Sequence, residues 1–447
     1  MSTATTTITA SVAAAAPAPE NVRMRIDGSD PKFGDFRDDL ARDGFAVVKG
    51  AIPRERALKY ADEMFSWLEN FNLGFDRHDP SSVHKDNLPV INEKGMCLQY
   101  AVTHEKFVWD VRSEPGVVET FEKVYNDKDL IVSFDAVNFG FPNRTDLPAN
   151  KPWPHQDQDP EKPGFRCLQG LVNLLPNGPD DGGLIVCRGG HLLSEQFHRE
   201  LADEERIPAW TPEWYGYTER GMKWLDDHGC KWEKVCAEPG DLLLWDSRTP
   251  HYNLSPKGET PRFCIYTCYM PVADTTNDDL SRKKEAFENW LGTTHWPNAK
   301  HTGSNVAKRD GKECPSNRFK PVNEPQLTNL SPLPSSSQAL LIESFKQLPP
   351  PIPGAKTYVY KTIRDLKLEV DVFIPDNLPY KDTTTAVLFL HGGGWIGGDR
   401  TEYCRPLFDE FLAQQYVVAS ANYKTPTGVG LYIRPTRRHS RSIEMDA

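Results

Sequence analysis

Short apolar runs and polar turn clusters alternate along the middle of the chain. Between about Leu130 and Met270 the runs are rich in β-branched and aromatic residues, and Gly, Pro, Asn and Asp separate them. They read LIVSFDAVNF, CLQGLVNLL, GLIVC, KWEKVCA, DLLLW and RFCIYTCYM. Many short strands with turns between them are typical of a β-sandwich or barrel, so we expect a mainly β fold.

A helical pattern precedes this β-rich region. Residues 44–52 (GFAVVKGAI) read as a strand, and Pro53 stands where a helix can begin. Apolar side chains then recur at helical spacing at Leu58, Ala61, Met64, Phe65 and Leu68. We therefore expect a flanking helix that packs its apolar face against the outside of the sheet.

Polar and low-complexity segments divide the chain into four parts. Residues 1–25, rich in Ala, Thr, Ser and Pro, predict a disordered N-terminus, and residues 26–300 form the expected main domain. Residues 301–340 contain few apolar side chains and many Pro, Ser and Asn, which predicts a linker to a last part at 341–447. Within the main domain, residues 193–229 interrupt the strand rhythm and form either a wall of a substrate pocket or a surface decoration.

Composition and charge narrow the class of partner. The 447 residues include 52 Lys and Arg against 63 Asp and Glu, a net charge of −11. This balance disfavours binding to nucleic acid or to an anionic membrane surface, and no apolar stretch is long enough to span a bilayer. The nine cysteines are scattered, which fits a reducing compartment, and no basic region precedes an apolar one at the N-terminus. We expect a cytoplasmic protein with a small-molecule substrate.

The chemistry is suggested by His155 and Asp157, which lie two positions apart, and by the more distant His251. In an extended segment, residues i and i+2 point to the same side, so one strand can present both His155 and Asp157 to one metal ion. His251 follows a second strand-like run and would complete the set from a neighbouring strand. Two imidazoles and one carboxylate bind non-haem Fe(II) on one face and leave positions open for a co-substrate and O2.

Four stretches around these residues resemble the phytanoyl-CoA dioxygenase family of iron and 2-oxoglutarate enzymes, fungal type. They are WPHQDQ, LQGLVNLLPNGPDDGGLIVCRGGHL, GDLLLWDSRTPHYN and RFCIYTCYMP. The resemblance implies a double-stranded β-helix (jelly roll) over roughly residues 26–300, Fe(II) ligands at His155, Asp157 and His251, and a 2-oxoglutarate-binding arginine at Arg262. A guanidinium suits this role because its planar fork holds a carboxylate with two hydrogen bonds. A carboxylate at position 157 favours oxygenation over halogenation.

The resemblance also suggests residues around the metal. Asn138 and Asn253 correspond to positions that contact 2-oxoglutarate in relatives, although either side chain could instead cap a loop. Gln99 and Trp153 are the expected substrate contacts. His191 is expected to be structural, because three protein ligands already complete the metal set.

The last part of the chain resembles a different class of protein. TTAVLFLHGGGWIGGD is similar to the oxyanion-hole segment of lipase- and esterase-type α/β-hydrolases, and FDEFLAQQYVVASANYK continues the similarity. No Gly-x-Ser-x-Gly follows, so His391 has no nucleophile to serve. We therefore expect residues 341–447 to be an incomplete α/β-hydrolase-like fragment.

Together these patterns predict an Fe(II)- and 2-oxoglutarate-dependent dioxygenase. It would use O2 to hydroxylate or otherwise oxidise a C–H bond of a small organic molecule, with release of succinate and CO2. No catalytic residue is expected beyond the metal ligands. The alternatives are a catalytically silent jelly-roll metal-binding module and a carboxylesterase activity in the C-terminal part. The sequence does not indicate the prime substrate or the oligomeric state.

Overall fold

A computed structural model of the chain gives two compact units, residues 1–340 and 341–447. The described residues are 22–209, 211–325, 355–363, 366–375, 386–390, 408, 411–414 and 416–421. Each unit is described by itself below. No helix among these residues is long and apolar enough to cross a membrane.

The first unit contains seven α-helices and fifteen strands among the described residues. The helices are α1 (Phe36–Asp43), α2 (Arg54–Glu69), α3 (Lys106–Arg112), α4 (Pro115–Tyr125), α5 (Gly190–Glu200), α6 (Glu219–Asp227) and α7 (Asn277–Glu288). The strands are β1 (Phe45–Val48), β2 (Met96–Cys97), β3 (Leu130–Val132), β4 (Val137–Gly140), β5 (His155–Gln156), β6 (Leu168–Asn173), β7 (Gly183–Arg188), β8 (Tyr215–Gly216), β9 (Lys231–Lys234), β10 (Leu242–Asp246), β11 (His251–Leu254), β12 (Arg262–Tyr266), β13 (Tyr269–Pro271), β14 (Lys308–Arg309) and β15 (Lys312–Glu313). Short 3₁₀ helices η1 (Pro80–Ser82), η2 (Val102–His104) and η3 (Val272–Asp274) join them.

Two antiparallel sheets make up the body of this unit. The larger sheet has the strand order β1-β10-β6-β12-β4-β2, and β13 joins it by pairing with β6 and β3. The smaller sheet has the order β8-β5-β11-β7-β9. Two sheets of antiparallel strands with flanking helices are the arrangement expected of a jelly roll. The mainly β prediction for this part of the chain is therefore confirmed.

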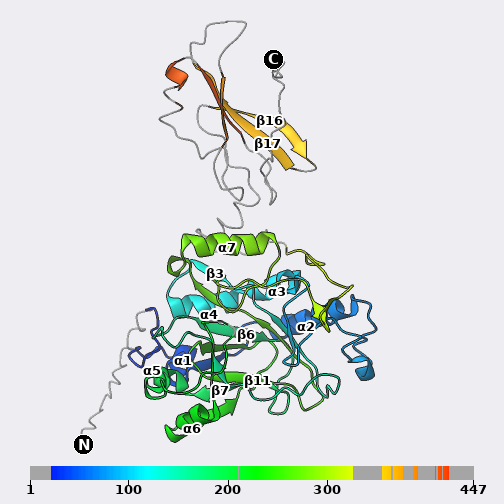
Figure 1. Cartoon of the computed structure of the whole chain (residues 1–447), viewed down its shortest axis with the longest axis vertical. Helices are drawn as coiled ribbons and strands as arrows, with labels where there is room; N and C mark the ends of the chain where they lie inside the picture. The colour runs from blue at the N-terminus through cyan, green and yellow to red at the C-terminus, as the bar shows by residue number, and fades with distance from the viewer. Residues whose placement is uncertain are drawn as a thin grey trace, which may run out of the picture. The chain divides into compact units, whose positions relative to one another are not determined.

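Alternation along the strands of the larger sheet creates two apolar layers. On β6, Leu168 and Val172 pack into the layer beneath helices α2, α3 and α4, whereas Leu171 points between the two sheets. The same alternation places Phe263 under the helices and Cys264 between the sheets. Figure 1 shows α3 and α4 over the part of the sheet that contains β6, and α5 and α6 beside β7.

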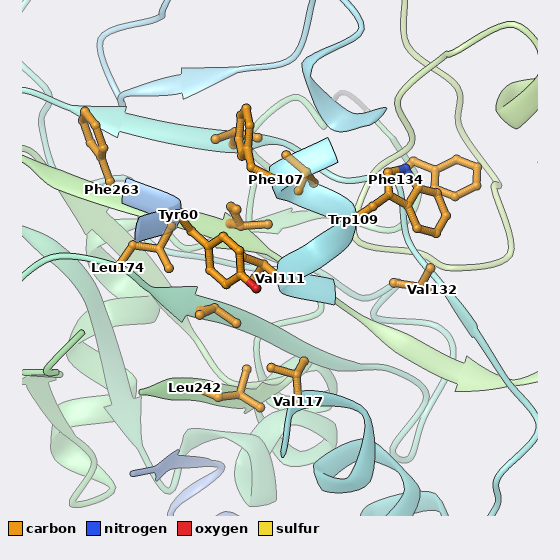
Figure 2. Close-up of a cluster of buried hydrophobic side chains, with 14 of the residues drawn as sticks. Tyr60, Phe107, Trp109, Val111, Val117, Val132, Phe134, Leu174, Leu242 and Phe263 are labelled. Carbon is orange, nitrogen blue, oxygen red and sulfur yellow. The ribbon is translucent and has the colours of Figure 1, made fainter. Parts of the chain in front are cut away.

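The layer under the helices is rich in aromatic side chains (Figure 2). Trp67 of α2 stacks on Phe139 of β4 with ring centroids 5.5 Å apart, and Phe263 meets Phe139 edge-on at 5.3 Å. Each such pair contributes about 0.5–1.5 kcal/mol to stability beyond the energy gained by burying its apolar surface. This layer fixes the outer face of the sheet, so the inner face is free to carry polar groups.

Helix α2 forms at the predicted place but presents a slightly different face. Its buried residues are Ala57, Tyr60, Ala61, Met64, Trp67 and Leu68. Leu58, which the periodicity assigns to the core, is 38% exposed. The helix is turned so that the larger ring of Trp67 is buried, and a buried tryptophan removes more apolar surface from water than a leucine does.

Residues 301–325, which the sequence assigns to the linker, pack against the first unit instead. Asn305 accepts a hydrogen bond from the Ala101 amide at its Oδ1 atom, 2.9 Å away, and Ala307 is buried. Further along, the amides of Val322 and Asn323 donate to the buried Glu105 carboxylate at 2.7 and 3.0 Å. Hydrogen bonds therefore hold this segment against the first unit, although its side chains are mostly polar. A prediction from hydrophobic patterning does not detect such contacts.

The second unit contains a four-stranded sheet among its described residues. Strands β16 (Lys356–Ile363), β17 (Leu366–Phe373), β18 (Ala386–Leu390) and β19 (Val417–Ala421) lie in the order β16-β17-β19-β18. The pair β18–β19 is parallel and the other two pairs are antiparallel. Residues 391–400, which include His391 and the glycine turn, lie outside the described residues, so the hydrolase-like turn stays a prediction.

Candidate metal centre

His155, Asp157 and His251 meet in the first unit although they are far apart in the sequence. His155 lies on β5 and pairs directly with His251, the first residue of β11. Asp157 follows β5 and points to the same side as His155, as the spacing of two predicts. The potential ligand atoms of the three buried side chains all lie within 4.8 Å of one another.

The outer nitrogens of both histidines are fixed by backbone carbonyls. His155 Nδ1 donates to the Trp153 carbonyl oxygen at 2.9 Å, and His251 Nδ1 donates to the Thr249 carbonyl oxygen at 2.9 Å. A carbonyl oxygen only accepts, so the proton resides on Nδ1 and each Nε2 keeps its lone pair. Both lone pairs face Asp157 Oδ2, which is 3.6 Å from His155 Nε2 and 3.4 Å from His251 Nε2.

Asp157 is held by groups from three other segments. Its Oδ2 atom accepts a hydrogen bond from Gln169 Nε2 of β6 at 2.8 Å. Its amide donates to the Ser247 carbonyl oxygen at 3.0 Å, and its own carbonyl oxygen accepts from His295 Nε2 at 3.1 Å. Polar partners of this kind orient a metal ligand and are a large part of what makes a site bind tightly.

Electrostatics keep two of the three ligands in their deprotonated forms. Burial lowers the pKa of His155, and the neighbouring His251 lowers it further. Burial raises the pKa of Asp157, but His155 and His295 outweigh this effect and hold that pKa well below its usual range. Three acceptor atoms thus converge in a buried space, and a cation is the group that would satisfy them together.

The three side chains open into a cavity of about 140 Å³ between the two sheets. Its wall is formed by Met96, Leu98, Asp135, Trp153, His155, Asp157, Gln169, Leu171, Leu184, Trp214, Trp245, His251, Tyr252, Asn253, Arg262, Tyr266, Thr294 and His295. Trp153 stacks on the His155 ring with centroids 4.1 Å apart, and the Lys94 ammonium lies 3.5 Å from the centre of the Trp153 ring. The aromatic wall fixes the histidine ring and excludes water from one side of it.

Among the described residues that line the cavity, Arg262 is the only arginine or lysine, and it lies on β12. It is 3% exposed, and its Nη1 atom has no hydrogen-bond partner among the described residues. Gly183 lies against it on β7: a Cβ there would stand 3.0 Å from Arg262 Nε. A buried guanidinium without a carboxylate is costly unless an anion joins it, so the site fits a carboxylate ligand such as 2-oxoglutarate.

The other predicted site residues are distributed differently. Asn253 lines the cavity; its Nδ2 atom donates to the Lys94 carbonyl oxygen and its Oδ1 atom accepts from Trp153 Nε1. Asn138 also donates to the Lys94 carbonyl oxygen but does not line the cavity, and its buried Oδ1 atom has no partner among the described residues. Gln99 is half-buried and does not line the cavity either. The alternate positions of that segment, Met96 and Leu98, do so instead.

His191 stands apart from the metal centre. His191 Nε2 lies 3.3 Å from the Ala41 carbonyl oxygen, next to Gly44 at the end of α1. Gly44 has φ 80°, and a Cβ at this position would overlap the His191 ring. His191 therefore packs the junction of α1 and α5, which agrees with the structural role expected for it.

Asp135, Gln169, Trp214 and His295 are among the residues of the cavity wall that were not singled out from the sequence. Asp135 did carry a signal, because it is a lone carboxylate within an apolar run, and the structure breaks that run into β3 and β4 around it. Trp214 belongs to the segment 193–229 that was predicted either to wall the pocket or to decorate the surface. Gln169 and His295 reach the site only through the tertiary fold.

Comparison with known proteins gives matches to the same part of the chain. The model of the family described as phytanoyl-CoA dioxygenase (PhyH) matches residues 40–264. The "Ava biosynthesis cluster protein O" of Aspergillus versicolor is 40% identical over 268 residues, which cover 59% of this chain and 86% of that protein. A "putative phytanoyl-CoA dioxygenase" of Dictyostelium discoideum is 21% identical over 288 residues, 55% of this chain and 78% of that protein.

A solved structure also aligns with this region. The epimerase SnoN, in complex with Fe3+, alpha ketoglutarate and nogalamycin RO, has 18% sequence identity and a TM-score of 0.38. The alignment covers 53% of this chain and 82% of SnoN.

Proposed function

The chain belongs to the phytanoyl-CoA dioxygenase family of iron- and 2-oxoglutarate-dependent oxidoreductases, and we propose that it hydroxylates a C–H bond of a small organic molecule. Iron, 2-oxoglutarate and O2 together supply the oxidising power, with release of succinate and CO2. The protein's own contribution is to hold, orient and shield the reactants. The single observation that carries the proposal is that three buried acceptor atoms share a cavity with a buried guanidinium whose Nη1 donor has no partner among the described residues.

In this proposal His155, Asp157 and His251 are the Fe(II) ligands. Both imidazoles present an Nε2 lone pair because their Nδ1 protons are bound by carbonyl oxygens. Gln169 keeps the Asp157 carboxylate turned toward the histidines by donating to Oδ2. This pre-set geometry limits the rearrangement that metal binding requires.

Arg262 is the proposed partner of the far carboxylate of 2-oxoglutarate. Its guanidinium is buried in the cavity wall and has an unused donor, so a carboxylate there would gain charge-assisted hydrogen bonds. Asn253 and Asn138 are proposed to help shape the 2-oxoglutarate site, because both side-chain amides donate to the Lys94 carbonyl oxygen and hold it in place. Trp153 is proposed to contact the substrate, and Gln99 could do so only if the segment around it moved.

The cavity wall is mainly aromatic and aliphatic, which suits a compact organic substrate more than a polymer. The Aspergillus versicolor relative is named as a biosynthesis cluster protein, and this name supports a biosynthetic role for the present chain. We also propose a cytoplasmic location, which is supported only by the sequence patterns described above.

The test is turnover of 2-oxoglutarate by the full chain, reconstituted with Fe(II) without oxygen and then exposed to air. A panel of small organic molecules is added, and succinate and consumed O2 are measured. We expect succinate formation that requires iron, 2-oxoglutarate and O2, and that at least one panel compound accelerates while gaining one oxygen atom. A catalytically silent metal-binding module would instead bind iron and release no succinate under any of these conditions.

A further inference from the structure

Asp135 is an acidic residue of the cavity wall that the proposed iron and 2-oxoglutarate chemistry does not use. It lies in the short connection between β3 and β4 and faces the same cavity as His155, Asp157 and Arg262. The side chain is buried, with the residue 8% exposed. Burying a carboxyl group lowers the stability of the fold unless a partner forms a hydrogen bond or an ion pair with it.

The described residues of the protein provide only one hydrogen bond to the Asp135 carboxyl group. Asp135 Oδ1 accepts one hydrogen bond, from the Ala136 amide at 2.6 Å. Within the part of the chain that the structure describes, no side chain donates to the carboxyl group and no Lys, Arg or His lies in salt-bridge range. The Oδ2 atom accepts no hydrogen bond from the described residues, and Asp135 lines the cavity.

The backbone around Asp135 is held firmly from behind. Arg112 Nη2 donates to the Asp135 carbonyl oxygen at 2.9 Å, and Arg112 Nη1 donates to the Thr103 carbonyl oxygen at 2.8 Å. Phe134 and Thr293 exchange two hydrogen bonds, from the Phe134 amide to Thr293 Oγ1 and from the Thr293 amide to the Phe134 carbonyl oxygen. The carboxyl group is thus placed in advance, so a ligand would not have to order it.

The electrostatic setting favours a positively charged partner. Burial raises the pKa of Asp135 to about 7, and the charge of Asp157 adds to this effect while Arg112 opposes it. If the proposed centre assembles, the charges of Fe(II) and Arg262 balance those of Asp157 and 2-oxoglutarate. Asp135 is then the remaining acidic group of the wall, and a cation would relieve its burial cost.

The rest of the wall fits the body of such a molecule. Trp153, Trp214, Tyr252 and Tyr266 present aromatic rings, and Met96, Leu98, Leu171 and Leu184 are apolar. Aromatic faces attract cations as well as apolar groups.

We propose that Asp135 positions the prime substrate by accepting a hydrogen bond from a basic nitrogen, and that the substrate is a small amine with an apolar or aromatic body. This inference rests on the proposed function, because it places the substrate in the same cavity as the iron centre. Asp135 selects and orients the substrate and takes no part in oxygen chemistry.

The experiment compares three probes of similar size and different charge. They are 2-phenylethylamine, 2-phenylethanol and 3-phenylpropionate, each titrated calorimetrically into the full chain with Fe(II) and 2-oxoglutarate under anaerobic conditions. We expect the amine to bind at least about tenfold more tightly than the alcohol, as a charge-assisted hydrogen bond predicts, and the carboxylate to bind most weakly. Asp135→Asn should remove the preference for the amine and leave alcohol binding nearly unchanged.

Asparagine keeps an acceptor for the Ala136 amide, so this variant should fold. Asp278→Asn makes the same chemical change at an exposed position of α7 and should preserve the preference. An amine preference that persists in Asp135→Asn would overturn the proposal. So would the absence of such a preference in the unaltered chain, including a lack of measurable amine binding, and this result does not depend on how the variant folds.

The same samples separate this inference from the proposed function. The iron chelate of a 2-oxoacid has a visible absorption band, and its absence would contradict the proposed function. The band together with equal binding of amine and alcohol would contradict only the role of Asp135. An amine preference without the band would support Asp135 as a binding residue and remove the oxygenase assignment.

Discussion

Arg262 illustrates at the scale of one residue how the site departs from ordinary protein interiors. Buried arginines usually meet a carboxylate or a set of carbonyl oxygens, as Arg112 does. Arg262 lies between the sheets with an unused Nη1 donor and no acidic partner among the described residues. An unused donor on a buried guanidinium lowers the stability of the fold. An anionic ligand that accepts from Arg262 would remove this cost and so explain why the arginine is buried there.

We predict that Arg262→Leu weakens the binding of 2-oxoglutarate about ten- to a hundredfold, because a charge-assisted pair contributes about 1.5–3 kcal/mol. Arg262→Lys should recover only part of this loss, since an ammonium lacks the planar fork. The measurement is the 2-oxoglutarate concentration needed for half-maximal succinate release. Iron content should stay unchanged, and Arg199→Leu on the exposed side of α5 should have no effect. An unaltered 2-oxoglutarate requirement in Arg262→Leu would make Arg262 a structural residue.

The site residues that could be predicted from the sequence are placed by local strand geometry, whereas the others are placed by the tertiary fold. His155 and Asp157 could be paired from sequence because strand geometry puts residues two apart on one side. Gln169 and Asp135 could not be assigned roles, because their place depends on which strand of the larger sheet passes the metal ligands and on where a strand breaks. Gln99 was expected at the cavity, but Met96 and Leu98 of the same segment line it instead, and Gln99 follows the end of β2 at Cys97.

At the scale of elements, a cluster of charges joins the segments that surround the cavity. The buried Glu213 carboxylate accepts from Arg166 Nη1 at 2.7 Å, from Lys162 Nζ at 3.2 Å and from Lys300 Nζ at 3.3 Å. These partners come from the turns after β5 and from the segment after α7, and Glu213 itself adjoins Trp214 of the cavity wall. The cluster therefore fixes the insertion 193–229 against the body of the unit.

We predict that Glu213→Gln lowers the free energy of unfolding by about 1–3 kcal/mol at pH 7, because it leaves three cations without their shared carboxylate. Burial raises the pKa of Glu213, but Arg166, the Asp159 amide and Lys300 outweigh it and lower that pKa to about 2. A depressed pKa stabilises the fold above the unfolded value of about 4.3 and loses this effect as pH falls toward 2. The difference between Glu213→Gln and the unaltered chain should therefore narrow between about pH 4.3 and pH 2.

Denaturant unfolding at several pH values provides the measurement. Glu161→Gln serves as the matched control, because Glu161 faces Arg206 at 3.8 Å on the exposed surface and such pairs contribute little. Equal stability of Glu213→Gln and Glu161→Gln at pH 7 would show that the cluster does not hold the insertion.

At the scale of the whole molecule, every residue of the candidate site belongs to the first unit. The cavity wall extends from Met96 to His295, and residues up to Asn323 are bound to Glu105 of that unit. The second unit supplies a separate four-stranded sheet, on which Tyr358, Val359, Tyr360 and Leu388 are exposed. The sequence indicated the change of character after residue 300, but residues 301–325 still pack against the first unit, because their backbone amides are hydrogen-bonded to it.

We predict that a chain ending at Pro325 turns over 2-oxoglutarate at the rate of the full chain and is more soluble, because it lacks the exposed apolar residues of the second sheet. A chain ending at Lys300 should be less stable. It loses the two amides that donate to Glu105 and the Asn305 contact, and an unsatisfied buried group costs about 1–3 kcal/mol.

Thermal unfolding and succinate release of both shortened chains, beside the full chain, provide the comparison. If the chain ending at Pro325 lost its turnover while remaining folded, the second unit would have to take part in catalysis. If the chain ending at Lys300 were as stable as the one ending at Pro325, residues 301–325 would be a linker after all.

The most direct measurement of the central claim is the iron content of the purified, anaerobically reconstituted protein, read together with succinate release from 2-oxoglutarate. The unaltered chain should bind one Fe(II) and form succinate, whereas His251→Ala should lose both while it keeps its fold. His228→Ala, which removes an exposed histidine stacked on Trp224, should behave like the unaltered chain. Full iron content and undiminished succinate release in His251→Ala would contradict the metal centre formed by His155, Asp157 and His251.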